Sequence, residues 1–161
     1  MASAGKPEFQ PLLAAGLHPH TLSELRKMCV IDFPLSTRRA LIMRSLEAMC
    51  TSISVALIRA EVWVDGSFLT KKIEPDDVDV LVTLNAEYAN GTSQQQEIIA
   101  KVDAKGFNMP VQCDSYLLFQ YPEGHPLYWT AEYMRAYWLR QFGFSRGNQL
   151  KGLAVIRTPI A

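Results

Sequence analysis

The sequence predicts one domain of the α/β (α+β) class, with a small mixed β-sheet and helices packed on it. Strand-like segments rich in branched and aromatic residues alternate along the chain with segments whose apolar residues recur at helical spacing. The chain has 161 residues, 48% hydrophobic and 20% charged, which is enough for one hydrophobic core. We expect residues 1–20 to form an N-terminal tail and residues 21–161 to form the domain.

The first half of the chain is expected to contain two helices. Thr21 is suited to an N-cap, and Glu24 completes a capping box for a short helix that ends near Cys29. The longest helix is predicted from Ser36 to Arg59, because Ile42, Leu46, Met49, Ile53 and Leu57 recur at helical spacing.

Two arginines stand in the first turn of that long helix. Arg38 and Arg39 are mildly disfavoured there by the helix dipole. They either face a nucleotide phosphate or an acidic partner, or they belong to a solvated first turn.

The second half of the chain is expected to continue with a helix, a strand and a helix. The turn at residues 90–93 precedes a helix that ends near Lys105. Residues 110–119 have the aromatic and branched content of a strand. A last helix is predicted from Thr130 to Phe142, and Gly143 is a natural stop.

Between these halves, two strands are joined by a loop that begins with a glycine. Residues 62–64 are typical of a strand, and Gly66 then lets the backbone come close to a ligand. A second strand is expected over residues 77–82. Because strand side chains alternate, Asp77 and Asp79 point to one face while Val78 and Val80 face the core. Two like charges on one face repel, so we expect a cation, most simply a divalent metal ion, between them.

These residues carry a resemblance to a known superfamily. A Gly66-Ser67 pair, a spacer and then Asp77-Val78-Asp79-Val80 resemble the active-site signature of the DNA polymerase beta-like nucleotidyltransferases, in particular the minimal nucleotidyltransferases. The flanking sequence is similar to a bacterial branch of that superfamily, and the shared residues are Asp65-Gly66-Ser67-Phe68, Thr70-Lys71, Pro75, Gly16-Leu17-His18 and Thr21-Leu22.

The resemblance implies the nucleotidyltransferase fold and a two-metal reaction that moves a nucleoside monophosphate from a nucleoside triphosphate to an acceptor. Asp77 and Asp79 would hold Mg²⁺ or Mn²⁺, and Gly66 and Ser67 would meet the β- and γ-phosphates. Members of the superfamily commonly take a third carboxylate from a later strand, and Asp114 inherits that role by strand order. The alternative is that Asp114 lies in water on an edge strand.

Other residues could contact the nucleotide. Thr70 and Lys71 follow the glycine, where a hydroxyl and an ammonium group can face a triphosphate, whereas Lys72 is expected to be solvated. Arg146 and Lys151 belong to a C-terminal segment with aromatic residues and no acid, which could bind phosphates and stack a base. These basic residues could equally balance acids elsewhere.

The acceptor is left open between a protein side chain, a tRNA end, an antibiotic and another nucleotide. Because minimal members of the superfamily often occur in toxin–antitoxin or phage-defence systems, the resemblance implies such a setting, with a neighbour-encoded protein as a partner and a homo-oligomer as an alternative assembly. A different reading is a catalytically inactive nucleotide-binding or regulatory module. A third is an antitoxin-like protein that binds a partner through its aromatic C-terminal helix.

Charge and cysteine content limit the cellular setting. The net charge is zero, so general attraction to nucleic acid or to an anionic membrane is not expected. The three cysteines are widely spaced in apolar stretches, which favours reduced, buried thiols in a cytoplasmic protein. The sequence has no apolar run of membrane-spanning length, and residues 1–11 lack the apolar segment of a signal peptide.

Overall fold

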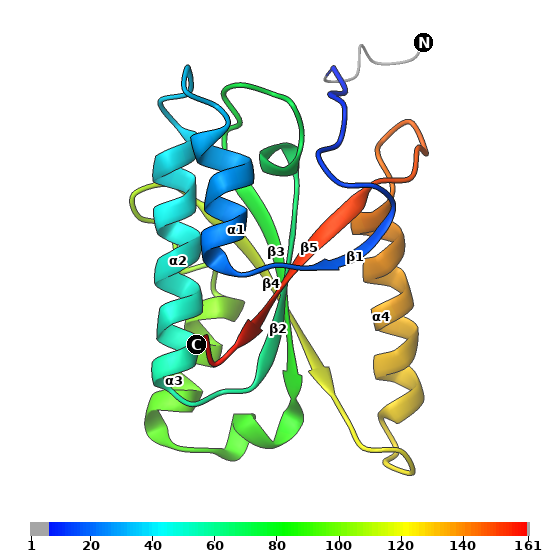
Figure 1. The fold of residues 1–161 in the computed structure, drawn as a ribbon. Coiled ribbons are helices and arrows are strands. Elements are labelled where there is room, and N and C mark those ends of the chain that lie inside the picture. Colours follow the sequence, from blue (N-terminus) through cyan, green and yellow to red (C-terminus); the bar gives the residue numbers. More distant parts are fainter. Residues whose placement is uncertain (1–6, 161) are drawn as a thin grey trace.

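A five-stranded mixed β-sheet with helices on both faces forms the protein (Figure 1). The structure is a computed structural model that describes residues 7–160. The strand order is β1-β5-β2-β3-β4, in which β1 with β5 and β3 with β4 are parallel and the other pairs are antiparallel. The strands are β1 Gly16–Pro19, β2 Ala60–Asp65, β3 Val78–Asn85, β4 Cys113–Gln120 and β5 Gly152–Thr158. This confirms the predicted α/β (α+β) class.

Three helices cover one face of the sheet, and α4 alone covers the other (Figure 1). Among residues 7–160, no helix is long and apolar enough to span a membrane. The helices are α1 Leu22–Arg26, which continues as a wider π-helical turn over Lys27–Ile31, α2 Arg39–Val55, α3 Ser93–Asp103 and α4 Tyr128–Gly143.

The two faces of the sheet bury different cores because side chains alternate along each strand. The valines Val78 and Val80 of β3 belong to the large core under α1, α2 and α3. Trp63 of β2 and Leu81 of β3 belong to a smaller core that Phe142 of α4 closes. Residues 65 and 79 therefore lie on the α4 face, at the edge of the smaller core.

The N-terminal segment differs from the predicted tail. Residues 16–19 form β1, which pairs with β5 in parallel and so belongs to the sheet. This short strand has no alternating pattern of its own, and only its pairing with a distant segment defines it. Residues 1–6 of the predicted tail lie outside the described residues.

Local signals located the helix starts well. Thr21 and Thr92 both form complete capping boxes, as the sequence predicts for Thr21. The long helix begins at Arg39 and not at Ser36, because Glu74 accepts hydrogen bonds from the backbone and hydroxyl of Thr37 and holds this segment outside the helix. The sequence analysis missed β5, although the run at residues 153–156 is apolar and partly β-branched.

Candidate active site

Three aspartates form a row across neighbouring strands. Asp65 at the end of β2 is paired with Asp79 of β3, and Asp79 is paired with Asp114 of β4. Strand alternation places all three on the α4 face, because each lies two residues from a side chain that packs in the α4 core or against it. The row therefore lies where β2 ends and where β3 and β4 begin, at one end of these three strands.

A cleft of about 560 Å³ opens beside this row. Its acidic side is formed by Asp65, Asp76, Asp77 and Asp79. Basic and aromatic side chains also line the cleft, and they are Lys72, Tyr116, Tyr137, Trp138, Phe142, Phe144, Arg146 and Lys151.

Burial and neighbouring charges make Asp79 hard to ionise. Burial is the main cause that raises the pKa of Asp79, to about 7, and the negative charges of Asp77, Asp65 and Asp114 add to it. Lys151 acts in the opposite direction. The carboxylates are thus close enough for each to disfavour ionisation of Asp79.

Asp65 is the most buried member of the row. Its residue is 4% exposed, and burial raises the pKa of its carboxyl. The ammonium group of Lys151 partly offsets this, because its Nζ lies 3.0 Å from Oδ1 and donates a hydrogen bond to Oδ2 at 3.1 Å. Lys151 reaches the row from the residue before β5.

The glycine of the signature is pressed against Asp79. Gly66 has a φ of 92°, and a Cβ at this position would lie 2.8 Å from Asp79 Oδ2 and 3.3 Å from the Asp79 backbone nitrogen. Only a residue without a side chain fits here. Gly66, Ser67 and the carboxylates therefore belong to one site.

A buried arginine binds the backbone of the loop over residues 66–77, which we call the signature loop. Arg39 is fully buried, and its guanidinium donates hydrogen bonds to the carbonyls of Phe68 at 2.7 Å, Thr70 at 2.6 Å and Lys72 at 2.5 Å. The same group also donates to the carbonyl of Cys29 at 2.9 Å and stacks on a phenylalanine ring. Burial lowers the pKa of Arg39.

Arg38 supports the other end of the signature loop. It donates hydrogen bonds to the carbonyls of Pro75 at 3.0 Å and Asp76 at 2.6 Å. Neither expectation for the arginine pair named this role: both guanidinium groups donate hydrogen bonds to carbonyls of the signature loop. The sequence could not predict this role, because every residue has a backbone carbonyl and a hydrogen bond to a carbonyl therefore requires no particular residue type.

Only some of the signature-loop residues that were predicted to contact phosphate line the cleft. Ser67 and Thr70 line it, but the Thr70 hydroxyl already donates to the Ser67 carbonyl at 2.7 Å. Lys71 is exposed and is not among the described residues that line the cleft. Lys72, expected to be solvated, lines the cleft in its place.

The C-terminal candidates and the third carboxylate have different outcomes. Arg146 and Lys151 both line the cleft. Asp114 lies beside Asp79 in the row but is not among the described residues that line the cleft. Its carboxylate forms an ion pair with Lys105 at 2.8 Å and accepts a hydrogen bond from the Tyr116 hydroxyl at 3.3 Å.

Comparison with known proteins places this fold and site in a family. A model described as "Family of unknown function (DUF6932)" matches residues 7–157, a range that includes every strand and helix of the structure except the last residue of β5. The chain belongs to the DUF6932 family. No curated protein and no solved structure matches it. Membership in DUF6932 assigns no activity, so the chemistry has to be argued from the residues of the cleft.

One member of the DUF6932 site was missed by the sequence analysis. The sequence analysis gave Asp65 no role beyond its place next to the Gly66-Ser67 pair, yet Asp65 is the most buried acid of the row. The available signal was strand alternation, because Asp65 lies two residues after the buried Trp63 and must share its face.

The donor chemistry of the DUF6932 cleft fits a divalent cation. Carboxylate oxygens are the preferred ligands of Mg²⁺, and the negative charges of Asp77, Asp65 and Asp114 add to the burial that raises the pKa of Asp79. Asp77 and Asp79 both line the cleft. Within residues 7–160, no group of three or more histidine, cysteine, aspartate or glutamate side chains has the arrangement of a metal centre. The fit therefore rests on the charge and chemistry of the two cleft aspartates.

Proposed function

We propose that this protein is a Mg²⁺-dependent nucleotidyltransferase that transfers a nucleoside monophosphate from a nucleoside triphosphate to an acceptor. The observation that carries the proposal is the contact between the Gly66 backbone and the Asp79 carboxylate, which joins the Gly-Ser turn and the aspartates in one cleft. The superfamily resemblance gives the same pair of elements as its signature.

The cleft supplies complementary groups for a nucleoside triphosphate. Asp77 and Asp79 would hold Mg²⁺ or Mn²⁺, and Asp114 is the third candidate ligand. The ion would neutralise the triphosphate and lower the pKa of the attacking hydroxyl. The Gly66-Ser67 turn and the basic groups that line the cleft orient the phosphates, and the rate then depends mainly on positioning and charge neutralisation.

The aromatic side of the cleft is suited to the nucleobase. Trp138 packs at a tilt on Tyr116, with ring centroids 4.7 Å apart, and edge-on to Phe142 at 5.6 Å. Such a wall stacks any base, since every base has a flat π-face. This argument supports nucleotide binding and leaves the preferred base open.

The first experiment compares the wild type with Asp77→Asn/Asp79→Asn, and with Asp103→Asn as a control on the exposed end of α3. Isothermal titration with ATP, GTP, CTP and UTP in Mg²⁺ measures binding, and α-labelled nucleotides with protein and tRNA fractions measure transfer. We expect metal-dependent binding and label transfer in the wild type and the control, and loss of both in the double variant. Transfer that survives in the double variant would contradict the proposal.

A second candidate is a nucleotide-binding or regulatory module without turnover. It is favoured by the ion pairs that already neutralise two acids of the row, Asp114 with Lys105 and Asp65 with Lys151. Such a module would bind nucleotide without metal, and its affinity would survive Asp77→Ala. The same titrations therefore separate the two candidates.

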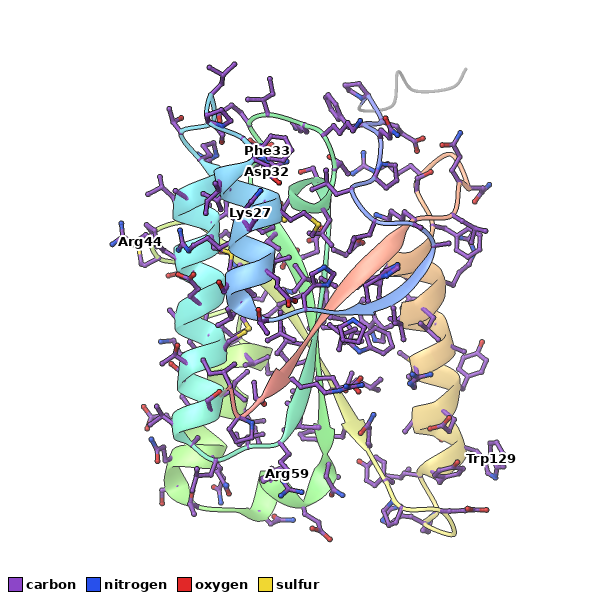
Figure 2. The ribbon with its side chains drawn as sticks, viewed as in Figure 1. Lys27, Asp32, Phe33, Arg44, Arg59 and Trp129 are labelled. Carbon is purple, nitrogen blue, oxygen red and sulfur yellow. The ribbon has the colours of Figure 1, made fainter. Side chains whose placement is uncertain are left out.

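A protein-binding role is favoured by the outer side of α4. Trp129 and Tyr133 are 78% and 75% exposed, and Figure 2 shows Trp129 projecting away from the sheet. Large exposed aromatic side chains are common at interfaces. Co-purification of a neighbour-encoded protein that is lost in Trp129→Ala would support this role, and light scattering would distinguish it from a homo-oligomer.

A further inference from the structure

Residues 7–13, the N-terminal strap, run between the signature loop and the turn that precedes β5 (Figure 1). The strap is fixed to the signature loop by backbone hydrogen bonds, from the Lys71 N–H to the Gln10 carbonyl and from the Leu12 N–H to the Leu69 carbonyl, both at 2.9 Å. Pro7, Glu8, Phe9 and Pro11 line the cleft. The strap is therefore one wall of the candidate active site.

The turn on the other side of the strap, residues 145–149, is closed by its own hydrogen bonds. The Ser145 N–H donates to the Gln149 carbonyl at 2.7 Å, and the Asn148 N–H donates to the Ser145 carbonyl at 3.0 Å. Asn148 adopts a φ of 62°, in the left-handed region that asparagine tolerates. Ser145, Arg146 and Gln149 of this turn line the cleft.

The strap places a carboxylate on this turn. The Gly147 N–H donates a hydrogen bond to Glu8 Oε1. A Cβ on Gly147 would lie 3.0 Å from Glu8 Oε2 and 3.2 Å from Oε1, so both oxygens rest against the glycine. The carboxylate of Glu8 thus accepts a hydrogen bond from a backbone N–H in a glycine-bearing turn, and Arg146 of the same turn lines the cleft.

Backbone N–H groups of tight turns beside a cation are typical phosphate sites, because they offer donors and positive charge without a bulky side chain. A carboxylate and a phosphate share this chemistry: both are anions that accept hydrogen bonds. Three residues of the turn line the same cleft as the aspartates, so the phosphates of a triphosphate bound in this cleft would come near the turn.

We propose that the 145–149 turn is an anion subsite for a phosphate group, and that Glu8 occupies it as an internal competitor until the ligand displaces it. The choice of a nucleotide as the natural ligand rests on the proposed function, whereas the anion subsite itself does not. Glu8 then lowers the apparent affinity of the turn for a phosphate group. An occupancy of about nine-tenths by Glu8 would weaken phosphate binding about tenfold.

The test uses inorganic tripolyphosphate without metal, which carries phosphate groups but neither a base nor a transferable nucleotide. Isothermal titration compares the wild type with Glu8→Gln, which keeps the side-chain shape and removes the charge, and with Glu97→Gln, an exposed control on α3. We expect Glu8→Gln to bind tripolyphosphate about tenfold more tightly than the wild type, and Glu97→Gln to match the wild type. Equal or weaker binding in Glu8→Gln would overturn the competitor role.

The Gly147 amide resonance gives a second readout that does not depend on affinity. An N–H bonded to a carboxylate resonates downfield, so the resonance should move upfield in Glu8→Gln and return downfield when tripolyphosphate is added. A Gly147 resonance that ignores tripolyphosphate would refute the subsite. Because neither measurement involves a nucleotide or a metal, both can succeed if the nucleotidyltransferase proposal fails, and both can fail if it holds.

Discussion

Asp65 and Asp79 lie directly opposite each other on the antiparallel strands β2 and β3, and both line the same cleft. Like charges in such a pair repel, and here both are largely removed from water. Lys151 is within ion-pair distance of Asp65. Ionisation of Asp79 beside Asp65 is therefore unfavourable, and the positive charge of Lys151 offsets part of that cost.

Replacing Asp79 should stabilise the metal-free protein at high pH. The folded-state pKa of Asp79 is about 7 against an ordinary value of 3.8. The cost of ionising it is complete above pH 7, shrinks as the pH falls, and is absent below 3.8, where both states are protonated. Asp79→Asn should therefore gain up to about 4 kcal/mol at pH 8, at about 1.4 kcal/mol per pKa unit, and almost nothing at pH 4.

Urea unfolding in EDTA at pH 8 and pH 4 measures this difference, with Asp103→Asn as the exposed control. A gain in Asp79→Asn that is larger at pH 4 than at pH 8 would show that charge is not its cause. Added Mg²⁺ should stabilise the wild type and leave Asp79→Asn unchanged.

Gly66→Ala should be more damaging than a glycine substitution that meets only backbone strain. Gly124 has a similar φ of 90° with no atom within 4 Å of an added Cβ, so Gly124→Ala is a matched control. We expect Gly124→Ala to cost about 1 kcal/mol and Gly66→Ala about 2 kcal/mol more, because the new methyl collides with Asp79. Equal losses in thermal unfolding would mean that Asp79 moves aside freely.

Arg39→Lys should destabilise the protein and loosen the signature loop. A lysine cannot reproduce the fork of donors that binds the carbonyls of Phe68, Thr70 and Lys72. We expect a loss of about 3–5 kcal/mol, as for other broken buried charge networks. Arg44 lies on the same helix and extends into solvent (Figure 2), so Arg44→Lys should change stability by less than about 0.5 kcal/mol.

Hydrogen exchange separates a local effect of Arg39→Lys from a global one. The Leu69 and Thr70 amides donate to carbonyls of the same loop and should exchange faster than amides of β2. Uniform acceleration across the sheet would indicate that Arg39 supports the whole fold and has no special role in the loop.

Glu74 should contribute stability that is lost in acid. Hydrogen bonds from the Ser36 and Thr37 side chains, followed by backbone N–H groups, lower the pKa of Glu74 from 4.5 to about 2. Its contribution is present above pH 4.5 and disappears as the pH falls through 2. The wild type should therefore be more stable than Glu74→Gln at pH 6, with a gap that narrows below pH 4. A gap of constant size in urea titrations would contradict this assignment, and Glu97→Gln serves as the control.

The parts of the fold that the sequence revealed are those with local causes. The β2–β3 pair and the capping box at Thr21 follow from alternation and from short-range hydrogen bonds. β1 depends on pairing with a distant segment, which no local pattern encodes, whereas β5 carries a local apolar signal at residues 153–156. The same limit explains why the prediction for Lys71 and Lys72 was reversed. Arg39 holds the backbone of the signature loop through hydrogen bonds to its carbonyls, and in the loop held in this way Lys72, not Lys71, lines the cleft.

The position of β5 has a consequence for synthesis of the protein. β5 lies between β1 and β2, so β1 has no partner strand and β2 has an unpaired edge until residues 152–158 leave the ribosome. Lys151, the counter-charge of Asp65, arrives with the same segment. Until then the nascent chain has the three aspartates without Lys151 and the sheet without the strand that joins β1 to β2, and we expect it to depend on chaperones until translation passes this point.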